Sequence, residues 1–386
     1  MARILEYKLN SLALPASSPL LREFHTRKTH IAGDPELGEA DYEGFDRTTI
    51  FYDLTLDRTA RELVAFCPPL VNLEQVLLPA TFEARRSSSD GWQRLSLRRH
   101  KRVKHELWQL PLPRSWRGAE SLEVRVRFAD GTGGEFVARR SGLRHVFQQW
   151  STLQKDNPPE WIVDWIRYAA TQGAERILLY DNGSQDFEGL GEICSRIAEE
   201  LEVVLISWPF PYGPRRSHYN QFAQGAQLNH ASRVLGSCEW QGFLDVDEYP
   251  VAPHGLEALL RKQRPWRGLL RVDNYLVPTM KGELTEGVTP RASDFGHREL
   301  RLRGRAHKYF SRPRALHEAR THNGRVRPGY TRGPVSPSKL YFLHFNHLTT
   351  DWRGYGSESR LKEWEFNPEQ HARCDAVRRV FEELEP

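Results

Sequence analysis

The sequence predicts an α/β protein in two parts: a β-rich, sandwich-like domain over residues 1–140, and an α/β domain over residues 141–386 that ends in a helical tail. Three observations favour this fold class. Up to about residue 140, short runs alternate apolar with polar residues, as half-buried strands do. From about residue 143, apolar strands alternate with amphipathic helices, which is typical of a largely parallel sheet with helices on both faces. One strand then stops abruptly on Asp245, Asp247 and Glu248.

In the first part, the clearest strand covers residues 122–128, where Leu122, Val124, Val126 and Phe128 fall on one face. A turn-forming stretch at 130–134 and a second apolar run at 135–138 follow it. The sequence therefore predicts a β-hairpin here.

In the second part, Asn157 followed by Pro158 predicts the cap and first turn of a helix that Gly173 ends. Further strands are expected at 176–180 and 203–208, and further helices at 187–200 and 218–229. Ligands of such sheets lie beyond the carboxyl ends of the strands, where Asp181 and Asp245 both fall.

Overall composition limits the class of protein and its partners. With 39% hydrophobic residues among 386, the chain is able to form a sizeable core. Its 55 Lys+Arg against 50 Asp+Glu give a charge of +5, with clusters at residues 98–104 and 298–314. Such clusters suit phosphates, anionic lipid or nucleic acid, although a solvated face is the commonest explanation.

Cysteine usage and hydropathy indicate the compartment. The four cysteines form no close pair, so neither a zinc site nor a disulfide framework is indicated. No stretch approaches the roughly 18 apolar residues of a spanning helix. We expect a cytoplasmic protein, whose contact with an anionic membrane, if any, is peripheral and at the inner face.

The acidic run suggests a metal site. Alternate residues of a strand share a face, so Asp245 and Asp247 are predicted to project together and hold one divalent cation, Mn²⁺ or Mg²⁺. Two acids separated by one residue occur roughly six times by chance in a chain of this composition. The hypothesis therefore depends on the surrounding motifs.

Several pieces occur in order: residues 155–157, a Trp-rich helix, residues 178–186, Asn220 with Gln221, and residues 243–248. Over roughly residues 143–350 the set resembles the nucleotide-sugar-binding half of a GT-A glycosyltransferase, and most closely glycosyltransferase family 92 and related family 2-like enzymes. The resemblance implies a Rossmann-like mixed sheet and metal-dependent sugar transfer with inversion at the anomeric carbon.

The resemblance also implies roles for individual residues. Asp181 matches the carboxylate that contacts the nucleotide base or ribose, although an Asx turn is the plainer alternative. Asp247 matches a metal ligand, and Asp245 matches either a metal ligand or a ribose partner. The loop that follows Asp181 is expected to be shaped by Asn182, Ser184 and Asp186.

Basic and histidine residues farther along complete the implied site. Lys308 and Arg312 are expected to neutralise the departing diphosphate, unless they are merely surface cations. His344 is the first choice for an imidazole metal ligand and His322 the second, with a hydrogen-bonded structural histidine as the alternative.

Inversion requires a carboxylate base for the acceptor hydroxyl. Asp273, Asp294 and Glu299 are the candidates in this sequence, and Asp294 is preferred because Gly and Ser neighbours suit an active-site loop. Residues 272–275 depart from the family's pattern, so the acceptor side is the weakest part of the resemblance.

The leading hypothesis is therefore transfer from a nucleotide sugar, with UDP as the favoured nucleotide, to a glycan or lipid-linked acceptor, without nucleic acid as a partner. One alternative is a non-catalytic glycan-binding protein that keeps the same fold. Another is a metal-dependent nuclease or phosphohydrolase that uses Asp245, Asp247 and a histidine, although few further acids lie nearby for a two-metal site.

Overall fold

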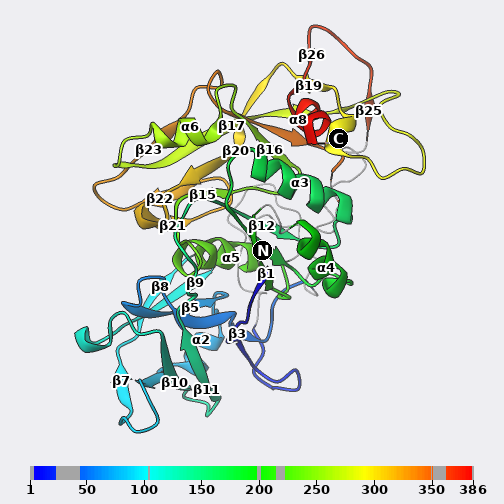
Figure 1. Cartoon of the computed structure of the whole chain (residues 1–386). Coiled ribbons are helices and arrows are strands. Elements are labelled where there is room, and N and C mark those ends of the chain that lie inside the picture. The colour runs from blue at the N-terminus through cyan, green and yellow to red at the C-terminus, as the bar shows by residue number, and fades with distance from the viewer. Residues whose placement is uncertain are drawn as a thin grey trace. The chain divides into compact units, whose positions relative to one another are not determined.

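The computed structural model describes residues 4–22, 44–102, 105–197, 201–213, 222–348, 350 and 362–384 (Figure 1). The chain divides into two compact units. The larger comprises Met1–Glu6, His145–Ile206 and Cys238–Pro386, and the smaller comprises Tyr7–Arg144 and Ser207–Ser237. Each unit is described by itself.

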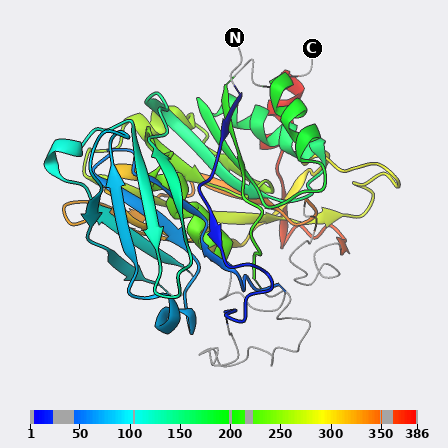
Figure 2. The same ribbon diagram turned by 90° about the horizontal axis from the view of Figure 1, so that it is seen from below.

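The smaller unit is built on a β-sandwich. One antiparallel sheet has the order β4 (Asp53–Leu56), β5 (Glu62–Cys67), β9 (Glu106–Pro111), β8 (Arg98–Lys101). The other has the order β11 (Gly133–Arg139), β10 (Ser121–Arg127), β6 (Thr81–Arg85), β7 (Gln93–Leu95), and its strands run from light blue to blue-green in Figure 2. Buried side chains of both sheets form one core, which confirms the predicted sandwich. The predicted hairpin is β10 with β11, in which Ser121 lies opposite Arg139.

The remaining elements of the smaller unit are β2 (Leu12–Ala13), β3 (Thr49–Phe51), α2 (Leu73–Leu77), the 3₁₀ turn η1 (Arg114–Trp116) and α5 (Phe222–Arg233). A buried polar contact joins α5 to β4. Nε2 of His230, on α5, lies 3.0 Å from the Asp53 carboxylate, which also accepts a bond of 2.9 Å from the Tyr7 hydroxyl. The helix predicted at 218–229 is therefore α5, which groups with this unit; residues 218–221 lie outside the described residues.

The larger unit contains a mixed sheet of ten strands among the described residues. β12 runs parallel to β13 and to β15, whereas β20 is antiparallel to both β15 and β17. β24 is parallel to β17 and antiparallel to the edge strand β16. The strands in sheet order are β1 (Ile4–Tyr7), β14 (Glu202–Ser207), β13 (Arg176–Asp181), β12 (Val146–Gln154), β15 (Cys238–Phe243), β20 (Leu302–Ser311), β17 (Arg267–Val277), β24 (Tyr341–Phe345) and β16 (Glu248–Val251), with β23 (Thr331–Pro334) beside β17.

Four helices of the larger unit bury their apolar faces in one core: α3 (Pro159–Thr171), α4 (Phe187–Ile197), α6 (Leu256–Arg261) and α8 (Ala376–Leu384). Trp165 of α3 meets Trp150 of β12 edge to face, with ring centroids 5.6 Å apart. A Cβ at Gly242 would lie 2.8 Å from the Phe310 ring, so this strand position requires glycine. These contacts hold α3 against the centre of the sheet.

The start of α3 differs from the prediction. Pro158, not Asn157, is the residue before the first helical turn, and no side chain caps the helix. The Asn157 side chain donates instead to Gln154 Oε1 at 3.4 Å, because β12 ends close to it. The end agrees with the prediction, since Gly173 adopts a φ of 85° just beyond Thr171.

The described residues of the larger unit also form three two-stranded sheets: β18 (Thr279–Met280) with β25 (Glu363–Trp364), β19 (His297–Glu299) with β26 (His371–Arg373), and β21 (Leu316–Ala319) with β22 (Gly324–Val326). The 3₁₀ turns η2 (Ala292–Asp294) and η3 (Pro313–Ala315) belong to this unit as well. The β21–β22 hairpin follows β20 directly.

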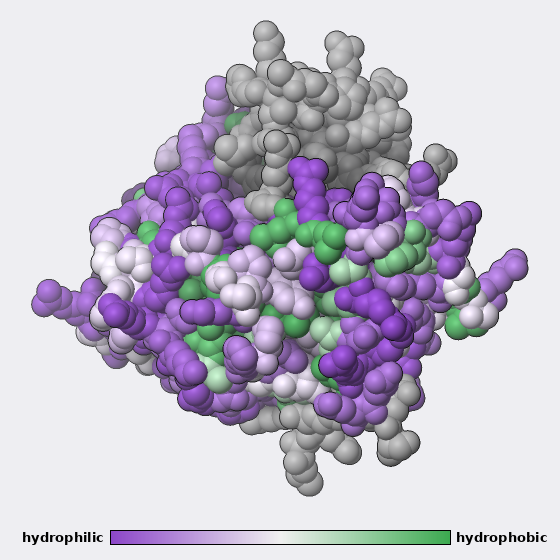
Figure 3. Space-filling model, turned by 90° about the horizontal axis from the view of Figure 1, so that it is seen from above, coloured by the Kyte–Doolittle hydropathy of each residue, from purple (hydrophilic) through white to green (hydrophobic). Residues whose placement is uncertain are grey.

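In the part of the chain that the structure describes, no helix combines the length and apolar character needed to cross a membrane. The face seen in Figure 3 is predominantly hydrophilic, with apolar residues gathered in small groups. The basic cluster predicted at 98–104 is partly neutralised, because Arg99 binds Glu74 and Glu106 while Lys101 binds Glu74 at 2.6 Å. Residues 103–104 lie outside the described residues.

Replacing Trp165 by alanine should destabilise the protein by about 3–5 kcal/mol, because the indole is fully buried against Trp150. Arg167→Ala, at an exposed position of the same helix, should change the free energy of unfolding by less than about 0.5 kcal/mol. Urea denaturation followed by circular dichroism measures both. Equal effects of the two substitutions would contradict the assigned packing of α3.

Candidate active site

The acidic run forms a turn rather than the end of a strand. β15 ends at Phe243, and the Glu248 amide donates to the Asp245 carbonyl at 3.0 Å, which closes a turn leading into β16. The prediction that Asp245 and Asp247 occupy alternate strand positions is therefore wrong. The turn nevertheless keeps both carboxylates beyond the carboxyl end of β15.

Strand pairing brings a histidine to this turn. Glu248 begins β16 and lies opposite His344 of β24, and the Phe345 amide donates to the Asp247 carbonyl at 2.9 Å. His344 Nε2 lies 3.3 Å from Asp247 Oδ2. One ligand atom from each of Asp247, Glu248 and His344 lies within 4.8 Å of the others, so the three are able to hold a metal ion.

A buried lysine neutralises the other side of the turn. Lys308 Nζ lies 2.7 Å from Asp245 Oδ2 and 3.1 Å from Glu248 Oε2. Burial alone would lower the pKa of Lys308, but the two carboxylates outweigh it and raise the pKa. The two carboxylates therefore keep the ammonium charged. Because Lys308 is only 3% exposed, that charge is shielded from solvent and pairs with these carboxylates.

Burial also affects the pKa values of Glu248 and His344. Burial raises the pKa of Glu248, while the positive charge of Lys308 opposes that shift. Burial disfavours a protonated His344, but the Asp247 charge and hydrogen bond prevail and raise its pKa. The three carboxylates outnumber the one lysine, so Asp247 favours positive charge beside it, either as a protonated His344 or as a bound cation.

The Asp247 carboxylate has spare acceptor capacity. Its Oδ1 is buried and has no hydrogen-bond partner among the described residues. A buried oxygen of this kind calls for a donor or a cation. Carboxylate oxygens together with an imidazole nitrogen suit Mn²⁺, so the residues present fit such an ion.

His322 lies in the turn between β21 and β22, and the charges of Lys308 and Asp245 affect its pKa. Burial of its imidazole and the nearby Lys308 lower its pKa to about 4, whereas Asp245 acts in the opposite direction. The ring is therefore neutral at pH 7 and its lone pair is available to a metal. His322 as a ligand stays a prediction.

The loop after β13 is closed on itself. The Asp181 carboxylate accepts bonds from the Gly183 amide at 3.1 Å, the Ser184 amide at 3.0 Å, the Ser184 hydroxyl and the Gln154 side chain. Burial raises the pKa of Asp181, and the hydrogen bonds of Ser184 and Gly183 oppose that shift. This is the Asx-turn geometry that was the plainer alternative, and it leaves a nucleotide contact of Asp181 untested.

Two neighbours in this loop also have structural partners. Asp186 Oδ1 accepts the Gly189 amide at 2.8 Å and so caps the first turn of α4. Asn182 is buried, and its backbone amide donates to the backbone carbonyl of Gln154 at 2.8 Å. The loop lies at the same edge of the sheet as the acidic turn, since β12 is parallel to both β13 and β15.

Arg312 is placed away from the acidic turn, which corrects the prediction that it meets the diphosphate. Its guanidinium binds Glu239, donates to the Arg267 carbonyl at 3.1 Å and stacks on Trp240 at 4.3 Å. Because β20 is antiparallel to β15, four residues of strand separate it from Lys308, or about 13 Å. Arg312 therefore fastens β20 to the opposite end of β15.

Asp294 ends the 3₁₀ turn η2, where its Oδ2 accepts the Arg291 amide at 2.7 Å. The Arg291 guanidinium in turn binds the buried Asp164 of α3. Asp294 itself is exposed, and its role as a base stays a prediction.

Sequence reasoning assigned no role to Glu248, which the structure places in the candidate metal cluster. The missing information was the register of β16 with β24, which turns Glu248 inward and opposite His344. Its position directly after two acids was the signal available in the sequence.

A mixed sheet of this order, with a carboxylate turn and an adjoining histidine beyond the carboxyl end of its parallel strands, defines an α/β protein of the GT-A type. The model of glycosyltransferase family 92 matches residues 154–381, which is more than half of the chain. The chain belongs to glycosyltransferase family 92, as the resemblance implied.

Plant members of the family are among the similar proteins. A family 92 protein of Ricinus communis is 29% identical over 149 residues, which are 35% of this chain and 25% of the relative. One of Oryza sativa subsp. japonica is 28% identical over 194 residues, or 50% of this chain and 28% of the relative. The matched segment thus spans about a quarter of the length of these relatives.

Solved structures give remote likenesses. HddC from Yersinia pseudotuberculosis has 12% identity and a TM-score of 0.30, covering 53% of this chain and 96% of that one. Residues 1–349 of TarS from S. aureus have 14% identity and a TM-score of 0.29, covering 52% of this chain and 60% of that one.

Replacing Lys308 by methionine should destabilise the protein by about 3 kcal/mol, because two carboxylates lose their buried partner. Adding Glu248→Gln should recover about 1 kcal/mol or more of this loss, since the two residues are in contact. Urea denaturation of the two single variants and the double variant measures the coupling. The exposed Lys281→Met is the control and should leave the denaturation midpoint in place; strict additivity would contradict the buried pair.

Proposed function

We propose that the protein is a metal-dependent, inverting glycosyltransferase that moves a sugar from a nucleotide donor, UDP by preference, to a glycan or lipid-linked acceptor. The observation that carries this proposal is the cluster of Asp247, Glu248 and His344, in which Asp247 Oδ1 is buried without a partner among the described residues. Membership of family 92 supports it independently.

Mn²⁺ or Mg²⁺ is the proposed cofactor, held by Asp247 and His344 with Glu248 beside them. When bound, the ion would stabilise negative charge on the diphosphate as the bond to the sugar breaks. Asp245 is less available for this role, because Lys308 binds its Oδ2 at 2.7 Å. We therefore assign Asp245 and Lys308 to holding the turn in shape, rather than to direct contact with the ion.

The donor nucleotide is proposed to lie along the edge formed by the carboxyl ends of β12, β13 and β15. Ligands of parallel sheets occupy this position. Gln154, Asp181 and the acidic turn all fall there, and the hydrogen bonds of Asp181 give the loop a fixed shape before any ligand binds. A fixed loop lowers the entropic cost of binding a nucleotide.

Inversion requires a carboxylate that accepts the proton of the attacking acceptor hydroxyl. Asp294 remains the proposed base. It is exposed on a short turn, and the Arg291–Asp164 ion pair anchors that turn to α3. Ala and Asn at position 294 test the assignment, since a true base should lower kcat with little change in donor binding.

Asp247→Asn should abolish the Mn²⁺-dependent thermal stabilisation by UDP and lower UDP release from UDP-sugars by about 100-fold or more, because one anionic ligand is lost. Differential scanning fluorimetry and a coupled assay of UDP release measure the two effects. Glu192→Gln, an exposed carboxylate-to-amide change on α4, should alter neither. If the wild-type protein binds glycan but shows no UDP release with any donor, the non-catalytic reading replaces this proposal.

His344→Ala and His322→Ala discriminate between the two candidate imidazole ligands. His344 lies 3.3 Å from Asp247, so its loss should weaken Mn²⁺ binding by about tenfold or more, whereas loss of His322 should have a smaller effect. Isothermal titration of Mn²⁺ in the presence of UDP measures both. The reverse ranking would make the β21–β22 turn the source of the ligand.

A further inference from the structure

The segment from Arg312 to Arg332 has an unusual charge composition. It contains six arginines and one acid, Glu318, with neither lysine nor aspartate. It forms η3, the β21–β22 hairpin and the start of β23, and the structure describes all of it. Arg312 is buried, and the other five arginines are exposed: Arg314, Arg320, Arg325, Arg327 and Arg332.

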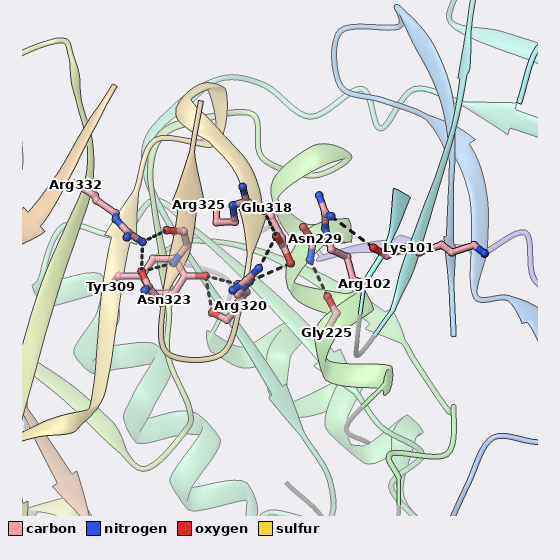
Figure 4. Close-up of polar contacts among 11 residues, drawn as sticks. Lys101, Arg102, Gly225, Asn229, Tyr309, Glu318, Arg320, Asn323, Arg325 and Arg332 are labelled. Carbon is pink, nitrogen blue, oxygen red and sulfur yellow. Dashed lines mark hydrogen bonds and ion pairs between the residues drawn. The ribbon is translucent and has the colours of Figure 1, made fainter. Parts of the chain in front are cut away.

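Several of these guanidinium groups are held in place (Figure 4). The buried Glu318 carboxylate accepts two bonds of 3.0 Å from Arg320, and Arg325 approaches it at 3.9 Å. Asn323 Oδ1 accepts a bond from Arg332 at 3.3 Å. One carboxylate thus serves two arginines, and the sequence has no further acid between Ala319 and Thr350, so the surface keeps an excess of positive charge.

Hydrogen bonds connect the β21–β22 hairpin to β23, and β23 to the segment that carries an exposed tryptophan. Arg332 donates to the Gly324 carbonyl at 3.4 Å, which joins β23 to the turn of the hairpin. The Thr331 amide donates to the Trp266 carbonyl at 2.8 Å. The Trp266 side chain is 49% exposed, with the Arg264 guanidinium 5.3 Å from its ring centre.

We propose that this arginine face, defined as Trp266, Arg320, Arg325, Arg327 and Arg332, binds the acceptor, and that the acceptor is an anionic polysaccharide. The inference rests on the proposed function. Guanidinium forks match the oxygens of carboxylates in pairs, and an indole ring stacks on a sugar ring. The repeated charge of an anionic polysaccharide suits arginines spread over adjacent strands.

The position of the face is consistent with an acceptor site. The Tyr309 hydroxyl donates to the Arg320 carbonyl at 2.8 Å, and Tyr309 lies next to Lys308 and opposite Phe243, the last residue of β15. The arginine face therefore begins beside the strand end that carries the acidic turn. A polymer held on the face would place one of its sugars beside the donor site.

A lipid surface is a poorer match. Peripheral binding to a membrane usually combines basic residues with apolar side chains that enter the lipid. The arginine face has one exposed large hydrophobic side chain, Trp266, and residues 312–332 add none to it. The excess of arginine over lysine likewise favours paired recognition of individual anions over a general surface potential.

The test compares two triple variants that remove the same amount of positive charge. The first alters the arginine face: Arg320→Gln/Arg325→Gln/Arg332→Gln. The control alters exposed arginines of the other unit: Arg94→Gln/Arg127→Gln/Arg139→Gln. Polygalacturonate is the anionic probe, and affinity electrophoresis at low salt measures binding. The first variant should bind about tenfold more weakly than wild type, while the control should bind normally. Trp266→Ala should also weaken binding.

Two further arms keep the proposal falsifiable if the triple variant does not fold. Fully methyl-esterified polygalacturonate, which lacks the charges, should bind wild type about tenfold more weakly than the acid form. Equal binding of the two polymers, equal loss in both triple variants, or preferential binding of phosphatidylglycerol vesicles or of RNA would each overturn the proposal. A separate titration of wild type with UDP and Mn²⁺ distinguishes failure of this inference from failure of the proposed function.

Discussion

The site depends on the ion pairs of one buried lysine. Three carboxylates follow one another within four residues, and in a poorly hydrated setting their mutual repulsion is costly. Lys308 neutralises Asp245 and Glu248, and Glu248 Oε2 also accepts the Asp245 amide at 3.0 Å. The same contacts therefore balance the charge and fix the backbone of the turn. They leave Asp247, beside His344, as the carboxylate that is open to a cation.

Sheet topology places Lys308 and His344 beside the acidic turn. β20 runs antiparallel to β15, with Tyr309 opposite Phe243, so Lys308 arrives beside the residues that follow β15. β24 pairs with β16 and sets His344 opposite Glu248. A slip of one residue in either pairing would turn Lys308 or His344 to the other face of the sheet. The buried Trp150, Trp165 and Phe310, packed around Gly242, stabilise the centre of that sheet.

Local patterns predicted what depends on local structure. The β10–β11 hairpin, the body of α3 and the strands around Arg176 and Val203 follow from periodicity and turn residues. Long-range register was beyond those patterns. Lys308 and Arg312 lie four residues apart, so an extended chain would put them on one face, and the sequence alone made them equivalent. Their positions along the strand separate them: one ends in the acidic turn and the other binds Glu239 at the far end of β15.

The same limit applies to charge. Two arginine-rich stretches, residues 98–104 and residues 312–332, look alike in the sequence, but their surroundings in the structure differ. In the sandwich, Arg99 and Lys101 are bound by Glu74 and Glu106, so that cluster mainly ties α2 to the strands. On the arginine face, a single buried glutamate serves two of the arginines, and the remaining charge is left facing solvent.

Excess charge of one sign destabilises a compact fold through repulsion. Acids concentrated in one turn and arginines on the adjoining strands are therefore better explained by ligands of opposite charge than by the stability of the fold.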